Sequence, residues 1–172
     1  MIPLLTPTAV ETVRNIRQAL EDWIRPATQG SNAYSYATTA VALCHHVEMR
    51  LEHEGQQLFD EIARLRVLLA HAADVMEGHG KGVAVAALIR RTLDDKGDPS
   101  IYPTLTATSH QVARLRQLIC EVQDIIIPED EAGIASDAAK ALRGEIRDYL
   151  AWQLDEKGRI VEPSFRGRGP RR

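Results

Sequence analysis

Residues 34–76, YSYATTAVALCHHVEMRLEHEGQQLFDEIARLRVLLAHAADVM, decide the fold. Apolar residues recur along this stretch every three or four positions, which places their side chains on one face of an α-helix. The N-terminal part of the stripe comprises Ala40, Cys44, Val47 and Leu51, and the C-terminal part comprises Leu58, Ile62, Leu65, Leu69, Ala72 and Met76. We predict that both parts are buried. The charged residues of the opposite face are expected in solvent: Glu48, Arg50, Glu52, Glu61, Arg64 and Arg66.

Gly55 leaves two structures open for this stretch. One is a single helix of about 40 residues, and the other is a hairpin that turns around Gly55, a residue type that often ends helices. The apolar stripe keeps its phase across the glycine, and the second arm of a hairpin would begin with Gln56 and Gln57, without a capping side chain. A glycine inside a helix costs only about 1 kcal/mol. These points favour the single helix.

The remaining chain predicts further helices and no strand. Thr8 and Glu11 have the spacing of a capping box at the start of the first helix, and Pro26 is expected to end it. Three glycines among residues 78–82 predict a turn. Further helices are expected over residues 83–93, from Thr108 or Ser109 to an acidic turn at 128–133, and over residues 135–155. The fold class is therefore all-α, a bundle of five or six helices around one long central helix.

Each of three further helices has its own apolar stripe, predicted to face the core. The stripes are Val10, Val13, Ile16, Leu20 and Trp23 in the first helix, Val112, Leu115, Ile119, Val122 and Ile126 in the fourth, and Leu142, Ile146, Tyr149 and Leu150 in the last. The two cysteines, Cys44 and Cys120, lie on apolar helix faces, where buried free thiols are expected.

Charge divides the chain into a body and a tail. Residues 157–172 carry six basic residues and one acid, whereas the rest carries fifteen basic and twenty-three acidic residues. We predict a single helical domain over residues 1–157 and a disordered basic tail over residues 158–172. The acidic body argues against general affinity for nucleic acid. The start of the chain lacks a signal peptide and no segment has the length of a membrane span, so a cytoplasmic protein is expected.

The best candidate for a metal site is the cluster from Cys44 to His53. Its possible ligands are His45, Glu48, Glu52 and His53. Di-iron helical bundles use Glu-x-x-His motifs on facing helices, and this cluster has none. No nucleophile motif or phosphate-binding loop occurs elsewhere. The sequence therefore predicts no catalytic residue and no cofactor.

Residues 16–93 carry scattered positions that resemble a known family. They are Trp23-Ile24-Arg25-Pro26, Tyr34, Thr39 to Leu43, Arg50-Leu51-Glu52 with Gly55, Ala63-Arg64-Leu65, and Leu68-Leu69. The family consists of small uncharacterised helical bacterial proteins, encoded beside aminoglycoside-phosphotransferase-like kinases and acyl-CoA dehydrogenases. Ala37 and Val41 depart from it, standing where the family tends to have Arg and Asn. The resemblance implies a helical fold and carries over no catalytic residue.

These observations predict a non-catalytic accessory protein that binds a protein partner, such as a kinase-like or acyl-CoA-metabolising enzyme. Tyr34, Tyr36 and Trp152 are candidate anchors, because aromatic residues dominate interface energetics. The same residues could instead cap the core. The alternative function is a metal- or small-ligand-binding bundle that uses the Cys44–His53 cluster. A homo-oligomer is compatible with either function.

Overall fold

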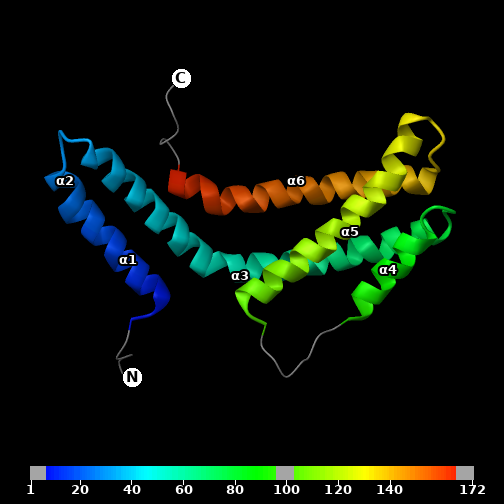
Figure 1. Ribbon diagram of the computed structural model, residues 1–172, viewed down its shortest axis with the longest axis horizontal. Helices are drawn as coiled ribbons and strands as arrows, with labels where there is room; N and C mark the ends of the chain where they lie inside the picture. Colours follow the sequence, from blue (N-terminus) through cyan, green and yellow to red (C-terminus); the bar gives the residue numbers. More distant parts are fainter. Residues whose placement is uncertain (1–6, 96–102, 166–172) are drawn as a thin grey trace. The chain divides into compact units, whose positions relative to one another are not determined.

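The computed structural model describes residues 7–95 and 103–165, with side chains up to residue 161 (Figure 1). These residues form an all-α fold without a strand, as predicted. The helices, in chain order, are α1 (Ala9–Ala19), α2 (Arg25–Ala27), α3 (Ala33–Glu77), α4 (Val83–Asp94), α5 (Leu105–Glu131) and α6 (Asp137–Phe165). One π-helical turn, η1 (Leu20–Ile24), joins α1 to α2 without a break.

The central helix is continuous, so the alternative in which residues 34–76 fold back on themselves at Gly55 is wrong. α3 runs for 45 residues through Gly55, which has an ordinary helical backbone and no neighbouring atom near its Cβ position. The favoured prediction of one helix is confirmed, because packing outweighs the small cost of a glycine within a helix.

The chain divides into two compact units, where the sequence predicted one domain over residues 1–157. The first unit comprises residues 1–56 and 155–172, and the second comprises residues 57–154. The boundary falls within α3 and again within α6. Each unit therefore has its own part of both long helices, and each is described below by itself.

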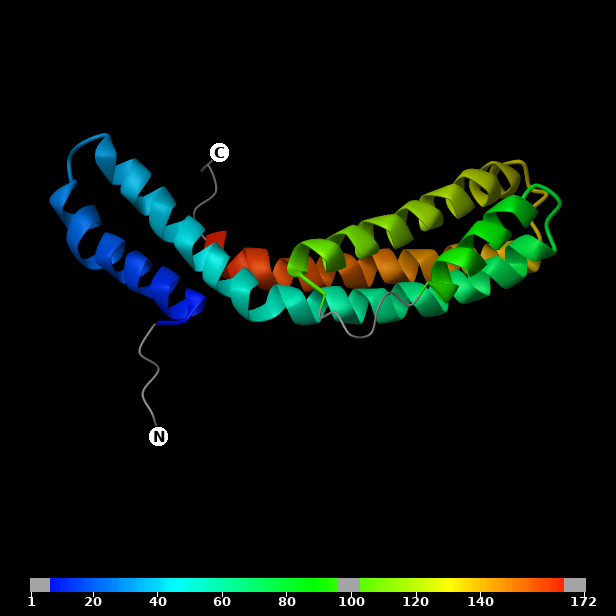
Figure 2. The same ribbon diagram turned by 60° about the horizontal axis from the view of Figure 1, so that its bottom comes forward.

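In the first unit, the α1–η1–α2 segment lies antiparallel to the N-terminal part of α3 (Figures 1 and 2). The predicted capping box opens α1: the Glu11 N–H donates to Thr8 Oγ1 at 3.2 Å, and the Thr8 N–H donates to Glu11 Oε2 at 2.7 Å. The helical segment ends one residue after Pro26, close to the predicted stop. We call these two antiparallel helical stretches, residues 9–27 and 33–56, the hairpin.

The predicted buried stripes of the hairpin are largely wrong. α1 has no buried residue, and Ile16 and Trp23 of its stripe are exposed. In α3, Val47 and Leu51 are exposed, whereas Ala37, Val41, Ala42 and Glu48 are buried. The buried face of α3 in this unit, which includes Glu48 on the side of α1, therefore differs from the predicted apolar stripe.

In the second unit, the C-terminal part of α3 lies beside α4, α5 and the first part of α6 (Figures 1 and 2). Their apolar faces share one core, and the predicted stripes are confirmed apart from Leu150, which is exposed. The core members include Leu65, Leu69, Ala72 and Met76 of α3, Ile89 of α4, Val112, Leu115, Ile119, Val122 and Ile126 of α5, and Leu142, Ile146 and Tyr149 of α6. Cys120 is exposed, contrary to prediction.

Both ends of α5 differ from their predicted positions. α5 begins at Leu105 and is capped by Thr104, whose Oγ1 accepts from the Ala107 N–H at 3.1 Å, so the predicted cap at Thr108 or Ser109 is wrong. α5 also continues past Pro128 to Glu131, although proline removes one hydrogen bond from the helix. The chain turns instead at Gly133, whose φ of 72° is readily adopted only by glycine.

The predicted start of the tail is also wrong. Gly158 does not end the last helix, since α6 continues to Phe165. Lysine, arginine and glutamate are all tolerated in a helix, and i,i+4 and i,i+3 pairs of Arg159 with Asp155 and Glu156 support this part of α6. The rest of the predicted tail, residues 166–172, lies outside the described residues.

Candidate functional site

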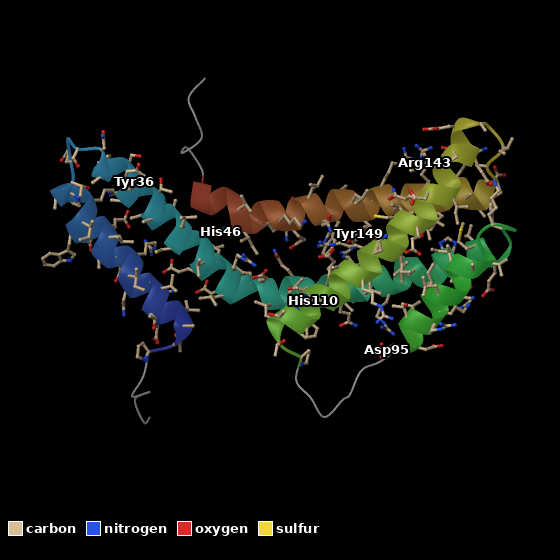
Figure 3. The ribbon with its side chains drawn as sticks, viewed as in Figure 1. Tyr36, His46, Asp95, His110, Arg143 and Tyr149 are labelled. Atoms are coloured by element: carbon tan, nitrogen blue, oxygen red, sulfur yellow. The ribbon has the colours of Figure 1, made fainter. Side chains whose placement is uncertain are left out.

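The turn end of the hairpin exposes a group of large apolar side chains, which we call the hairpin tip: Trp23, Ile24, Tyr34 and Tyr36. Trp23 is 75% exposed, Tyr36 76% and Tyr34 42%. Figure 3 shows Tyr36 near the N-terminal end of α3. Large aromatic side chains are usually buried, so three exposed ones near a single turn form an unusual apolar surface.

The two tyrosines of the tip point in different directions. Residues two positions apart on a helix differ by about 200°, which places Tyr34 and Tyr36 on nearly opposite sides of α3. Trp23 belongs to the π turn η1, before the chain reverses. The tip therefore presents its apolar side chains on more than one side of the end of the hairpin.

Below the tip, a buried carboxylate fastens α1 to α3. Glu48 is buried, and its Oε2 accepts from Arg17 Nε at 2.9 Å. Its second oxygen lies 3.7 Å from Arg14 Nε and has no hydrogen bond within the described residues. Arg14 also contacts Glu52 at 3.1 Å. These ion pairs join α1 to α3, and α1 itself has no buried residue.

The structure does not assemble the predicted metal cluster. Glu48 and Glu52 are paired with arginines from α1, and His53 Nε2 lies 4.0 Å from Glu52 Oε2. His45 is half-buried and none of these contacts reaches it. Across residues 7–95 and 103–161, no three His, Cys, Asp or Glu side chains are grouped so as to hold a metal ion. The geometry therefore provides no support for a metal site at Cys44–His53.

The second unit contains a buried polar cluster that the sequence did not reveal. Glu61 accepts four hydrogen bonds: its Oε1 from Arg116 Nε at 2.7 Å, Tyr149 Oη at 2.5 Å and Gln153 Nε2 at 2.8 Å, and its Oε2 from Arg116 Nη2 at 2.7 Å. These partners come from α5 and α6, so one carboxylate links three helices.

The environment of Glu61 keeps its carboxyl group ionised. Burial opposes ionisation of the Glu61 carboxyl, but the hydrogen bonds from Arg116, Tyr149 and Gln153 outweigh it and hold its pKa below the ordinary value. Burial, together with the hydrogen bond to Glu61, raises the pKa of the Tyr149 hydroxyl, which stays protonated. Both oxygens of the carboxylate accept hydrogen bonds from side chains of α5 or α6. The cluster therefore joins these two helices to α3.

Trp152, the third predicted anchor, serves the core. It is half-buried against the apolar core of the second unit, and the Arg64 guanidinium lies 4.5 Å above its ring. The ring also packs against Tyr149 at a centroid distance of 6.2 Å. Of the two roles considered for the aromatic residues, Trp152 has the core-capping one, whereas Tyr34 and Tyr36 are exposed.

The spacing of apolar residues around Glu61 indicated that this side chain is buried. Glu61 lies four residues before Leu65, about 40° from it around the helix, so it shares the buried face. The charge of Glu61 predicts a position in solvent instead. The residues that donate hydrogen bonds to its carboxylate lie 55 to 92 positions away in the sequence. Sequence spacing alone could not identify those partners.

Comparison with protein-family models, with curated proteins and with solved structures finds no match to this chain. None of the helices within the described residues has both the length and the apolar character needed to cross a membrane.

Proposed function

We propose that this chain is a non-catalytic accessory protein of the cytoplasm that binds a protein partner through the hairpin tip. The observation that carries the proposal is the exposure of Trp23, Tyr34 and Tyr36 at one end of the first unit. Tryptophan and tyrosine are the residues most often found at the energetic centre of protein interfaces. These three side chains do not belong to the apolar core, which lies in the second unit.

The arrangement of buried polar groups also supports binding over turnover. The buried carboxylates of the described residues, Glu48 and Glu61, are both held by arginines. An active site needs reactive groups that face an accessible cavity, whereas these groups join helices. The sequence resemblance to proteins encoded beside kinase-fold phosphotransferases and acyl-CoA dehydrogenases suggests an enzyme of one of these classes as the partner.

The test is co-expression of the full chain with each enzyme encoded beside it, followed by affinity purification through a tag on the enzyme. We expect one enzyme to retain the chain and to lose solubility or activity without it. The double variant Trp23→Ser, Tyr34→Ser should abolish retention while its circular dichroism and thermal melting stay unchanged, because both side chains are exposed.

The matched control is Phe59→Ser, which removes an exposed aromatic residue of the second unit. Retention should survive this change. If no neighbouring enzyme retains the chain, or if both variants lose retention equally, the hairpin tip is not the binding site. Stoichiometric metal in untagged protein would favour the metal-binding alternative instead.

A further inference from the structure

One face of the hairpin carries apolar side chains from both of its helices, and we call it the apolar hairpin face: Val13 and Ile16 of α1, and Val47 and Leu51 of α3. Ile16 is 50% exposed, Val47 42% and Leu51 44%, and Val13 is half-buried. Residues 155–161 of α6 belong to the same unit, and these exposed fractions are those that remain with α6 in place. The described residues of the unit therefore cover this face only in part.

The ion pair between Arg17 and Glu48 shows that the two helices contribute to one face. These two side chains meet at 2.9 Å, so both point toward the contact between α1 and α3. Ile16 and Val47 each precede one of them in the sequence, so both are rotated from the contact by about 100° in the same sense. Antiparallel neighbours are related by a two-fold axis normal to their common plane. Equal rotations in the same sense therefore lead to the same face of the hairpin.

Val13 and Leu51 lie on that face as well. They are rotated from the same contact by about 40° and about 60°, again in the same sense. Arg14 and Glu52, which pair at 3.1 Å, are rotated in the opposite sense, so this ion pair lies on the other face. The ion pairs between the helices also place Val13 nearly level with Leu51 along the hairpin. The apolar hairpin face thus consists of two adjacent layers, each with one side chain from either helix.

We propose that residues 1–5, Met-Ile-Pro-Leu-Leu, cover the apolar hairpin face. All five side chains are apolar. The segment is joined through Thr6 and Pro7 to the N-cap of α1, so it starts from the end of the hairpin at which α1 begins. Five extended residues span about 17 Å, whereas Ile16 lies only about 10 Å along the helix axis from Ala9. The segment is therefore long enough to reach both layers of the face.

Two prolines favour an extended segment over a longer α1. Proline disfavours the α-helical conformation of the residue before it, which here concerns Ile2 before Pro3 and Thr6 before Pro7. A backbone that is already restricted loses less conformational entropy when it packs. The proposal does not depend on a partner at the hairpin tip, because none of the aromatic side chains of the tip belongs to the apolar hairpin face.

The first test is disulfide formation within the full chain, with Cys44 and Cys120 replaced by serine. Leu4→Cys combined with Leu51→Cys should form an intramolecular disulfide under mild oxidation, because the segment brings the two Cα atoms within the roughly 6 Å that a disulfide needs. The control combines Leu4→Cys with Asn15→Cys. Asn15 is exposed and nearer in sequence, but it is rotated by about 160° from the contact and faces away from α3.

Mass spectrometry of the digested chain measures the two yields. We expect a yield several-fold higher for the pair with Leu51→Cys than for the control pair. Equal yields, or no disulfide in either chain, would overturn the proposal. A disulfide-linked dimer on a non-reducing gel would assign the face to a second copy of the chain, which would overturn it equally.

The second test compares melting temperatures by circular dichroism. The variant Ile2→Ser, Leu4→Ser, Leu5→Ser should melt several degrees lower, because three apolar side chains lose their contact with the face. The control Val67→Ser changes an exposed apolar residue of the second unit and should leave the melting temperature unaltered. In a chain that carries Leu51→Ser, the N-terminal variant should have a smaller effect, because changes at residues in contact are not additive. Additive losses, or no loss, would contradict the proposed contact.

Discussion

The two parts of α3 have the same apolar spacing and opposite environments. Leu65 and Leu69 are completely buried in the second unit, whereas Val47 and Leu51 of the first unit are exposed. In the second unit the stripe packs into one core with α4, α5 and α6, whereas α1, which lies beside α3 in the first unit, has no buried residue. Apolar periodicity therefore identifies an apolar helix face, but does not show whether the rest of the chain buries that face.

The largest expected difference between the two parts of α3 is in their response to the replacement of a leucine by alanine. Leu69→Ala should lower the free energy of unfolding by about 2–5 kcal/mol, because it leaves a cavity in a closed core. Leu43→Ala should cost less than about 0.5 kcal/mol in dilute protein, since the side chain is already half in water. Urea denaturation followed by circular dichroism measures both. Equal losses would show that the exposed stripe is covered in the folded monomer.

The two buried carboxylates provide a second comparison. Glu61→Gln should destabilise the second unit by about 3 kcal/mol, because it leaves Arg116 without its charged partner in a half-buried site. Glu48→Gln should cost less, since Arg17 and Arg14 can regain water. Urea denaturation checks both, with Asp155→Asn, which breaks an exposed ion pair, as the control. A loss at Glu48 equal to that at Glu61 would contradict this ranking.

The same carboxylate predicts an acid dependence of stability. The pKa of Glu61 is lower in the folded chain than its ordinary value of 4.5, so the unfolded chain takes up the proton first. The stabilisation from Glu61 is therefore fully present above about pH 5 and is lost as the pH falls through the folded pKa. Thermal melts between pH 6 and pH 3 should show a smaller decrease for Glu61→Gln than for the unaltered protein. Parallel decreases would mean that Glu61 does not titrate in this way.

The smallest expected effect concerns the glycine at the boundary of the units. Gly55→Ala should raise the free energy of unfolding by up to about 1 kcal/mol, because alanine favours a helix and nothing lies near the added methyl group. Gly144→Ala, at an equally open helical position of α6, is the matched change in the second unit. A loss of melting temperature for Gly55→Ala alone would indicate that the helix is interrupted there.

The sequence was sufficient where many local preferences agreed. The all-α class, the capping box of Thr8 and Glu11, the continuity of α3 and the core of the second unit all followed from spacing and caps. Helix ends at Pro128 and Gly158 were wrong because tertiary packing and side-chain pairs extended the helices beyond their breakers. Spacing indicated the buried position of Glu61, but the partners of Glu48 and Glu61 could not be predicted, because they are distant in sequence.

The two tryptophans of the chain belong to different units and differ in their surroundings. Trp23 of the first unit is exposed, and Trp152 of the second is half-buried beside Arg64. Indole emits at longer wavelength in water than in an apolar environment, so the two residues have separable fluorescence. Trp152 reports the melting of the core, and Trp23 would report the proposed occupation of the hairpin tip. The chain thus carries an intrinsic optical probe for each unit, and no label needs to be attached.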